Sequence, residues 1–209
     1  MAEHLNDEEQ VEALKKWWSE NGKSVVGGVV LGLVLVGGWR GWQYYEQNRA
    51  ETAGARYDAL LVAAESGQPE RAVQLAEGLR AEFEETAYAS LAALQAAKLK
   101  FEAGDRGAAQ VQFAWVRANA PDPALRQVAT LRLARILLDD ADLDAAQRLL
   151  DAAPRDAFAP ELAELRGDLA RARGDLAAAR AAYEEALAGK PDSGVLLRMK
   201  LDDLPGGKS

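Results

Sequence analysis

The segment LRGDLARARGDLAAARAAYEEALAGKP, from Leu165 to Pro191, decides the fold class. It contains two stretches rich in Ala, Leu, Arg and Glu, residues that favour helix, with Gly174 and Asp175 between them. Glycine readily adopts the left-handed backbone of a tight turn, and a small side chain such as that of Ala179 lets two helices approach where they cross. The segment therefore predicts two antiparallel helices joined by a short turn.

The same pattern occurs three times upstream. Each unit has a small residue at the turn, two or three polar or turn-forming residues, and an alanine five places after the turn residue. The turns lie 37, 37 and 33 residues apart, at Gly67, Gly104, Ala141 and Gly174, and the alanines are Ala72, Ala109, Ala146 and Ala179. Helix pairs repeated at this period are typical of solenoids, so the sequence predicts an all-α solenoid of helical hairpins.

The last unit resembles a tetratricopeptide repeat in five positions. The small residue of the first helix is Gly167, and the alanine at the helix crossing is Ala179. The aromatic residue is Tyr183, the second small residue is Ala186, and the terminal proline is Pro191. The second unit matches in part, through Ala97, Ala109, Phe113 and Pro121. The third matches less, through Ala134, Ala146 and Ala153, with Phe158 where proline is expected, and the first, around Leu60 and Ala72, is only repeat-like.

A different pattern, ENGKSVVGGVVLGLVLVGGWRGWQYY from Glu20 to Tyr45, precedes the repeats. Its fifteen uncharged residues from Val25 to Trp39 would form about 22 Å of helix, whereas the hydrocarbon core of a bilayer is about 30 Å thick. The length becomes sufficient if Lys23 and Arg40 extend toward opposite head-group layers. Aromatic residues flank both ends, as in membrane-spanning helices: Trp17 and Trp18 on one side, Trp39, Trp42, Tyr44 and Tyr45 on the other. We therefore predict a single transmembrane anchor.

A cleaved signal peptide is a weaker interpretation of this segment. Cleavage requires a small-x-small pattern shortly after the apolar stretch, but residues Trp39 to Glu46 are bulky or charged, which favours an uncleaved anchor. Charge does not decide the orientation, because three basic residues precede the segment and three follow it: Lys15, Lys16 and Lys23, then Arg40, Arg49 and Arg56. The absence of cysteine is compatible with an oxidising compartment for the larger part of the chain.

The sequence thus predicts three parts. Residues 1–22 form a polar N-terminal tail with a short amphipathic helix around Val11 to Trp18, residues 23–45 the anchor, and residues 46–209 the solenoid domain. The helix of the anchor is expected to run on to Val62, since no proline intervenes.

Composition argues against catalysis and against several classes of ligand. The chain has no cysteine, and its one histidine, His4, lies in the polar N-terminal tail; together these exclude a zinc site, a cysteine nucleophile and a Ser-His-Asp triad. The 33 acidic residues outnumber the 25 basic ones, and this speaks against nucleic acid as a partner. We expect no enzyme activity, no cofactor and no metal.

Two candidate partner-binding surfaces follow from residue spacing. In the anchor, small residues recur at four-residue intervals, at Ser24, Gly28 and Gly32 and again at Gly37 and Gly41. Such stripes let another membrane helix approach closely, although glycine is also common in membrane helices for no such reason. In the solenoid, the repeat register predicts a concave face formed by Tyr57, Leu61, Leu94, Lys98, Phe101, Leu131, Arg135 and Leu138.

This partly apolar concave face with scattered cations suits extended or unfolded segments better than a single acidic tail. The alternative is that most of these residues belong to the ordinary core between repeats. Burial of Leu94, Leu131 and Leu138 would distinguish the two interpretations.

Further segments carry a closer resemblance. They are QVEALKKWWSENGKSVVGGVVLG from Gln10, WRGW from Trp39, LRLARILL from Leu131, ELRGDLARARGD from Glu164 and RMKLDDL from Arg198. From about Glu8 to Leu204 the chain is similar to the YfgM family of ancillary SecYEG translocon subunits, single-span proteins of the Gram-negative inner membrane. The segment from Glu65 to Tyr88 departs most from the family pattern.

The resemblance implies a cytoplasmic N-terminus, one membrane helix and a periplasmic tetratricopeptide-like domain. It also implies association with the SecYEG translocon and with a PpiD-like membrane-anchored periplasmic chaperone, in the trafficking and folding of exported proteins. Two alternatives remain open: a general membrane-anchored adaptor for cell-envelope assembly, which would share the same physical features, and a holdase that binds unfolded exported proteins directly.

Overall fold

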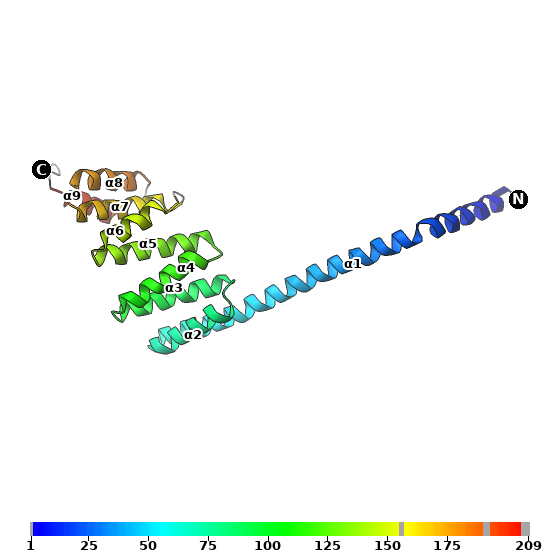
Figure 1. Ribbon diagram of the computed structural model, residues 1–209, viewed down its shortest axis with the longest axis horizontal. Coiled ribbons are helices and arrows are strands. Elements are labelled where there is room, and N and C mark those ends of the chain that lie inside the picture. Colours follow the sequence, from blue (N-terminus) through cyan, green and yellow to red (C-terminus); the bar gives the residue numbers. More distant parts are fainter. Residues whose placement is uncertain (1, 155–156, 190–192, 206–209) are drawn as a thin grey trace. The chain divides into compact units, whose positions relative to one another are not determined.

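The computed structural model describes residues 2–154, 157–189 and 193–205, and every regular element within those ranges is a helix. The helices, shown in Figure 1, are α1 (Ala2–Glu65), α2 (Pro69–Glu82), α3 (Ala87–Glu102), α4 (Arg106–Asn119), α5 (Pro123–Asp139), α6 (Leu143–Asp151), α7 (Ala159–Ala172), α8 (Leu176–Ala188) and α9 (Gly194–Asp202). The all-α prediction is confirmed. Pro191, expected to end the last repeat, lies outside the described residues.

Helix α1 is longer and more continuous than the sequence suggested. We predicted a polar tail, a separate short helix over Val11 to Trp18 and then the anchor, but one helix runs from Ala2 to Glu65. The predicted continuation to Val62 is confirmed, and the reason is the same throughout: α1 contains no proline to interrupt the hydrogen-bond ladder. The chain divides into two compact units, Met1–Glu51 and Thr52–Ser209, so the end of α1 belongs to the second unit.

The turns between paired helices have the backbone that the repeat pattern predicted. Three of the turn glycines have positive φ angles, 70° at Gly67 and 82° at both Gly104 and Gly174. In the last of these turns the following aspartate caps the next helix, because the Ala178 N–H donates to Asp175 Oδ1 at 2.9 Å. Ala141 is the exception, since it holds the same left-handed conformation at φ 59° with a side chain that disfavours it.

We expect Ala141→Gly to stabilise the solenoid by about 1 kcal/mol, because glycine adopts a positive φ without the steric cost that Cβ imposes. The reverse change at an equivalent turn, Gly104→Ala, should destabilise it by a similar amount. Urea unfolding of the detergent-solubilised full chain, followed by circular dichroism, measures both. A lower transition midpoint for Ala141→Gly would contradict the strain assigned to this turn.

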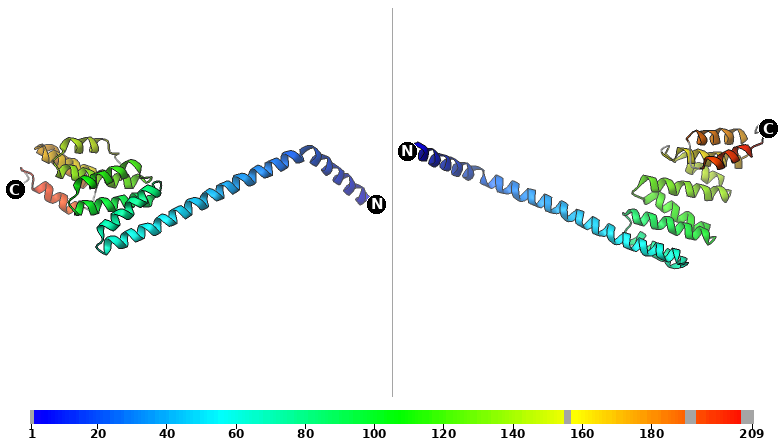
Figure 2. Two further views of the ribbon diagram at one scale, coloured as in Figure 1. Left: turned by 60° about the horizontal axis from the view of Figure 1, so that its bottom comes forward. Right: turned by 180° about the vertical axis from the view of Figure 1, so that it is seen from behind.

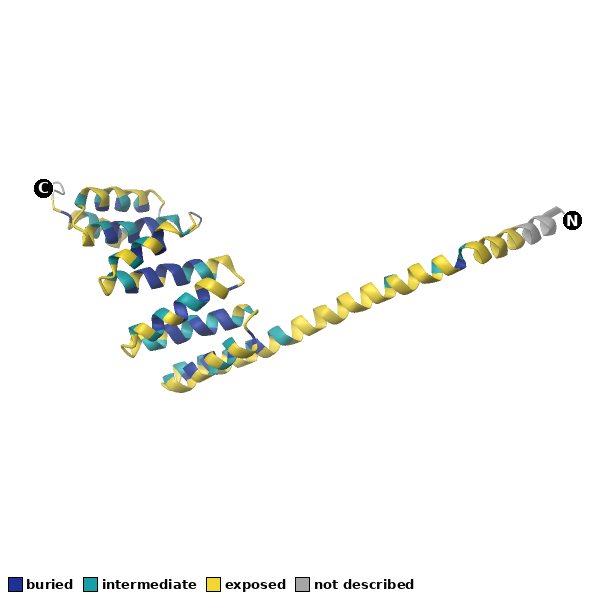
Figure 3. Ribbon diagram, in the orientation of Figure 1, coloured by how far each residue is buried: buried dark blue, intermediate teal, exposed yellow. Residues whose placement is uncertain are grey.

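The core of the second unit runs along the inner faces of successive helices (Figure 3). It consists of three clusters of buried residues: one from the end of α1 with α2 and α3, a central one from α3 to α7, and one from α7 to α9. The four crossing alanines predicted from the repeats are all fully buried, namely Ala72, Ala109, Ala146 and Ala179. Small side chains at the crossings are thus what allows the paired helices to pack closely.

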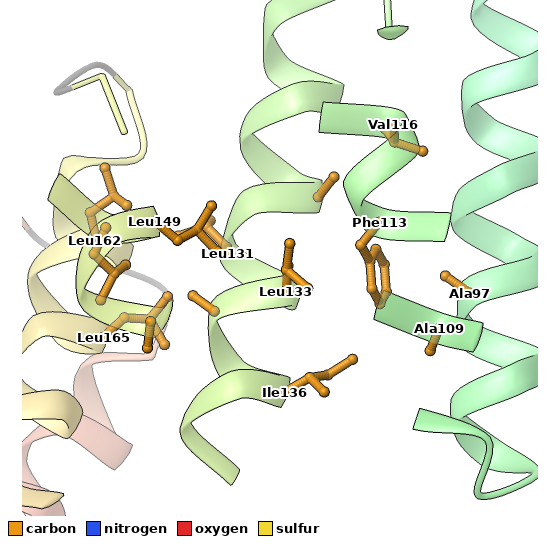
Figure 4. Packing of buried hydrophobic residues seen from close by; sticks show 14 of the residues in the cluster. Ala97, Ala109, Phe113, Val116, Leu131, Leu133, Ile136, Leu149, Leu162 and Leu165 are labelled. Carbon is orange, nitrogen blue, oxygen red and sulfur yellow. The ribbon is translucent and has the colours of Figure 1, made fainter. Parts of the chain in front are cut away.

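Helix α5 is covered on two sides, as Figure 4 shows. Its Leu131 points toward Leu149 of α6 and Leu162 of α7, while Leu133 and Ile136 point the other way, toward α4. The part of the α5 surface that carries Arg132 and Arg135 remains exposed. The packing of α5 therefore decides which of its side chains are available for binding.

The last helix closes the solenoid. Leu197 of α9 and Leu204 just beyond it are buried against Tyr183 and the alanines of α7 and α8. The views in Figure 2, from two other directions, show α9 following α8 at the C-terminal end of the stack. Helix α9 and the residues just after it thus cover, with Leu197 and Leu204, the apolar side that the last hairpin would otherwise expose.

Candidate partner-binding surfaces

One helix among the described residues is long and apolar enough to cross a membrane, within the Gln10–Glu65 part of α1. The mean hydropathy of its most apolar window is 1.6, and only 6% of that window is buried by the protein itself. A buried core helix would be covered by other elements, whereas the apolar side chains here have lipid as the environment that suits them. The protein is therefore membrane-anchored through a single helix.

The predicted small-residue stripe lies open on this helix. A Cβ atom placed on Gly28, Gly32, Gly37 or Gly41 would meet no other atom within 4 Å, and Ser24 is exposed. Both groups of small residues can thus be reached by another helix within the bilayer. Their role in helix contact stays a prediction.

On the solenoid, two adjoining hollows lie along α3, α5 and α7, the first helices of successive hairpins. We call them together the A-helix groove. The first, of about 400 Å³, is lined by Lys98, Phe101, Glu102, Phe113, Arg132, Arg135, Ile136 and Asp139. The second, of about 630 Å³, is lined by Arg135, Leu138, Asp139, Glu164, Asp168, Arg171, Ala172, Ser193, Leu196 and Lys200. Because Arg135 and Asp139 line both hollows, the groove is continuous from α3 across α5 to α7 and α9.

The structure divides the predicted concave residues into three groups. Four of them line the A-helix groove: Lys98, Phe101, Arg135 and Leu138. Leu138 is at the same time half-buried and packs against the central cluster. Three are half-buried and pack against the core clusters: Tyr57 and Leu61 on the first, Leu94 on the central one. Leu131 requires a correction, because it is only 6% exposed and is part of the central cluster.

The reason for the correction is the packing around α5. Leu131 and Arg135 are four residues apart and were expected to share a face, but α6 and α7 cover the α5 surface near Leu131 and leave Arg135 open. Of these two residues, only Arg135 is accessible from the groove, and its role in binding stays a prediction.

Several groove residues were not predicted. Arg132 lies three residues before Arg135 in the segment LRLARILL, so the helical spacing of two arginines in an otherwise apolar run could have identified it. Helix α9 adds two further lining residues, Leu196 and Lys200. No sequence pattern indicates that they face the groove. They reach the groove only because the chain folds back after α8.

The charged groups in the first hollow are unequally paired. Glu102 lies 3.8 Å from Lys98, and Asp139 lies 3.3 Å from Arg106, which also approaches Asp140 at 2.6 Å. Neither Arg132 nor Arg135 forms an ion pair with any residue in the described part of the chain. These two guanidinium groups remain available to a ligand.

The second hollow ends at a buried ionic cluster that joins α9 to α7. Lys200 Nζ donates to Glu164 Oε1 at 2.8 Å and to Asp168 Oδ2 at 2.7 Å, and Ser193 Oγ donates to Glu164 Oε2 at 3.0 Å. Glu164 is only 4% exposed. A carboxylate so far from water requires such partners, so the cluster fixes the position of α9.

Tyr183 of α8 completes this cluster. Its hydroxyl donates to Asp168 Oδ1 at 2.8 Å. Burial of the ring raises the pKa of Tyr183, and the hydrogen bond to the Asp168 carboxylate raises it further. The phenol therefore stays protonated and serves as a permanent donor.

Comparisons with known proteins agree with this architecture. A family model described as a tetratricopeptide repeat-like domain matches residues 15–206. A protein of Escherichia coli (strain K12) called "Ancillary SecYEG translocon subunit" is 32% identical over 201 residues, which cover 95% of this chain and 97% of that protein. The chain belongs to the family of ancillary SecYEG translocon subunits. A relative of the same name from Haemophilus influenzae is 30% identical and covers 98% of this chain and 100% of its own.

The fold of this ancillary-subunit family member is also similar to that of solved structures. MamA 41-end from Desulfovibrio magneticus RS-1 superposes with a TM-score of 0.51 at 19% identity, over 72% of this chain and 86% of that one. At this level of identity the likeness concerns the fold alone. It supports the helical solenoid of the family member and carries no information on its partners.

Proposed function

We propose that the chain is an ancillary subunit of the SecYEG translocon, tethered to the inner membrane by residues 23–45. The N-terminus is cytoplasmic and the solenoid is periplasmic, where it assists the trafficking and folding of exported proteins beside a PpiD-like chaperone. The observation that carries the proposal is similarity over nearly the whole chain, membrane helix included, to relatives named for that complex.

The two surfaces support a non-catalytic, protein-binding role. An open stripe on the membrane helix suits contact with a neighbouring membrane helix, and the A-helix groove presents apolar and cationic groups together. Tethering raises the effective concentration of a nearby partner or emerging chain to the millimolar range. Weak binding by the groove is then sufficient.

The proposal is tested by crosslinking in cells. A photo-reactive amino acid at Gly28 or Gly32 is expected to give crosslinks to a SecYEG subunit. The same label at Val29, about 100° around the helix from Gly28 and away from both groups of small residues, should give fewer. Crosslinks to unrelated membrane proteins, with none to SecYEG from either face, would instead favour the general envelope adaptor.

Replacing both Gly28 and Gly32 by Leu is expected to reduce recovery of SecYEG with the purified chain at least threefold, because two isobutyl groups keep a partner helix at a distance. Insertion should be unaffected, since leucine suits the bilayer. The matched control is Val29→Leu with Val36→Leu, which adds bulk on the side of the helix between the two groups of small residues and should leave recovery unchanged. Equal recovery from both double variants would remove the stripe as a contact surface.

A further inference from the structure

The first hollow of the A-helix groove combines an apolar floor with two unpaired cations. Phe113 and Ile136 lie at its floor, nearly buried, and Phe101 is 40% exposed at its side. An exposed aromatic side chain beside a hollow of about 400 Å³ leaves room for one large apolar side chain of a ligand.

The cations give this hollow its selectivity. The whole chain has a net charge of −8, yet Arg132 and Arg135 stand at the hollow without ion-pair partners among the described residues. A guanidinium group pairs best with a carboxylate, to which it can donate two parallel hydrogen bonds. A carboxylate beside an apolar side chain would therefore complement both features of the hollow.

We infer that the first hollow binds a protein segment in which a large apolar side chain is flanked by acidic residues. This inference rests on the proposed function, in that the segment would belong to an exported protein near the translocon. The expectation from sequence was for extended or unfolded segments rather than a single acidic tail, and the inference adds acidic residues on both sides of a large apolar side chain. The ligand's carboxylates meet Arg132 and Arg135, and its apolar side chain enters beside Phe101.

The second hollow provides a surface along which a longer bound segment would extend beyond the first hollow. Leu138 and Leu196 line it together with Arg171. Apart from Arg135 and Asp139, which it shares with the first hollow, its remaining acidic and basic groups already satisfy one another: Glu164, Asp168 and Lys200. A ligand passing this point would meet apolar surface and one further cation. The acidic requirement is thus strongest at the first hollow.

The test uses the full chain in nanodiscs of zwitterionic lipid and a fluorescent nine-residue peptide with a central Phe flanked on each side by Asp-Glu. Fluorescence anisotropy should detect binding that weakens as salt is raised. Replacing the peptide's acidic residues by Asn and Gln, or its Phe by Ser, should each weaken binding at least tenfold. Equal binding of the amide peptide would overturn the charge requirement without any change to the protein.

On the protein side, Arg132→Glu with Arg135→Glu should weaken binding of the acidic peptide at least tenfold. The matched control is Arg148→Glu with Arg198→Glu, two exposed arginines outside the groove that change the net charge equally; it should stay within about twofold. An equal loss in both double variants would show a general charge effect and overturn the proposal.

Other occupants of the groove have distinct signatures. If a second copy of the chain fills it, Arg132→Glu with Arg135→Glu would dissociate a dimer; if lipid fills it, anionic nanodiscs would abolish peptide binding. Either result overturns the proposal. Recovery of SecYEG is measured on the same variants. If the chain recovers SecYEG but does not bind the peptide, only the ligand assigned to the groove is refuted. If the unmodified chain gives no crosslinks to SecYEG, the proposed function is refuted.

Discussion

Gly167→Ala is expected to destabilise the solenoid by about 2–3 kcal/mol, because the new methyl group has no room. A Cβ atom on Gly167 would lie 2.4 Å from both Cδ1 and Cε1 of Tyr183, well inside van der Waals contact. The Tyr183 ring is fully buried and its hydroxyl is bonded to Asp168. The ring cannot move aside without losing that bond or displacing α8.

The control for this variant is Gly78→Ala in the middle of α2, where a Cβ would meet nothing within 4 Å. Since alanine has the higher helix propensity, this change should stabilise the protein by up to about 1 kcal/mol. The same intrinsic gain applies at Gly167, so a loss there reports the clash alone. Urea unfolding of the full chain followed by circular dichroism measures both.

A second variant separates the clash from other effects. Tyr183→Leu removes the two ring carbons that a Cβ on Gly167 would meet, and combining it with Gly167→Ala should cost less than the sum of the single changes by at least 1 kcal/mol. Additive losses would mean that the glycine is needed for some reason other than the ring of Tyr183.

The fold was largely predictable because its determinants are local and repeated. In the last three hairpins a left-handed turn residue, a capping aspartate and an alanine at the crossing lie within a few residues of one another, so each of these hairpins can be identified from its own sequence. The anchor was equally predictable from length and apolar content. By contrast, the continuity of α1 through its polar beginning depended on the absence of interruptions rather than on a positive signal.

The candidate site was predictable only in part, for a geometric reason. A residue on the first helix of a repeat can face the groove or the next repeat, and a small difference in helix crossing decides between them. Arg135 and Leu131 are four residues apart on α5, but neighbouring helices bury Leu131 while Arg135 remains exposed. The half of the groove made by α9 depends on contacts across more than 30 residues, such as that of Lys200 with Glu164, and no local pattern encodes these.

The ionic cluster connects the stability of α9 with the shape of the groove. Leu196 and Lys200 are at once part of α9 and part of the lining of the second hollow. If α9 detached, this hollow would lose one wall while the first hollow, between α3 and α5, would keep all of its lining residues. Peptide binding at Arg132 and Arg135 should therefore survive changes that release α9.

Lys200→Met should release α9 from α7. We expect this change to destabilise the C-terminal end of the solenoid by about 2–3 kcal/mol, because it leaves Glu164 and Asp168 without their shared cation in a site largely removed from water. The estimate lies below the value for a fully buried pair, since the Lys200 side chain is 17% exposed. Urea unfolding measures the loss, and hydrogen exchange should show faster exchange of the amides of α9.

Two comparisons distinguish an ionic cause from the loss of packing. Lys98→Met removes a lysine whose pair with Glu102 is 56% exposed on both sides, and pairs of that kind contribute well under 1 kcal/mol. Adding Glu164→Gln and Asp168→Asn to Lys200→Met removes the uncompensated charges and should restore at least half of the lost stability. If this triple variant were no more stable than Lys200→Met alone, unpaired carboxylates could not be the cause, and the attachment of α9 would have to be assigned to Leu197 and Leu204.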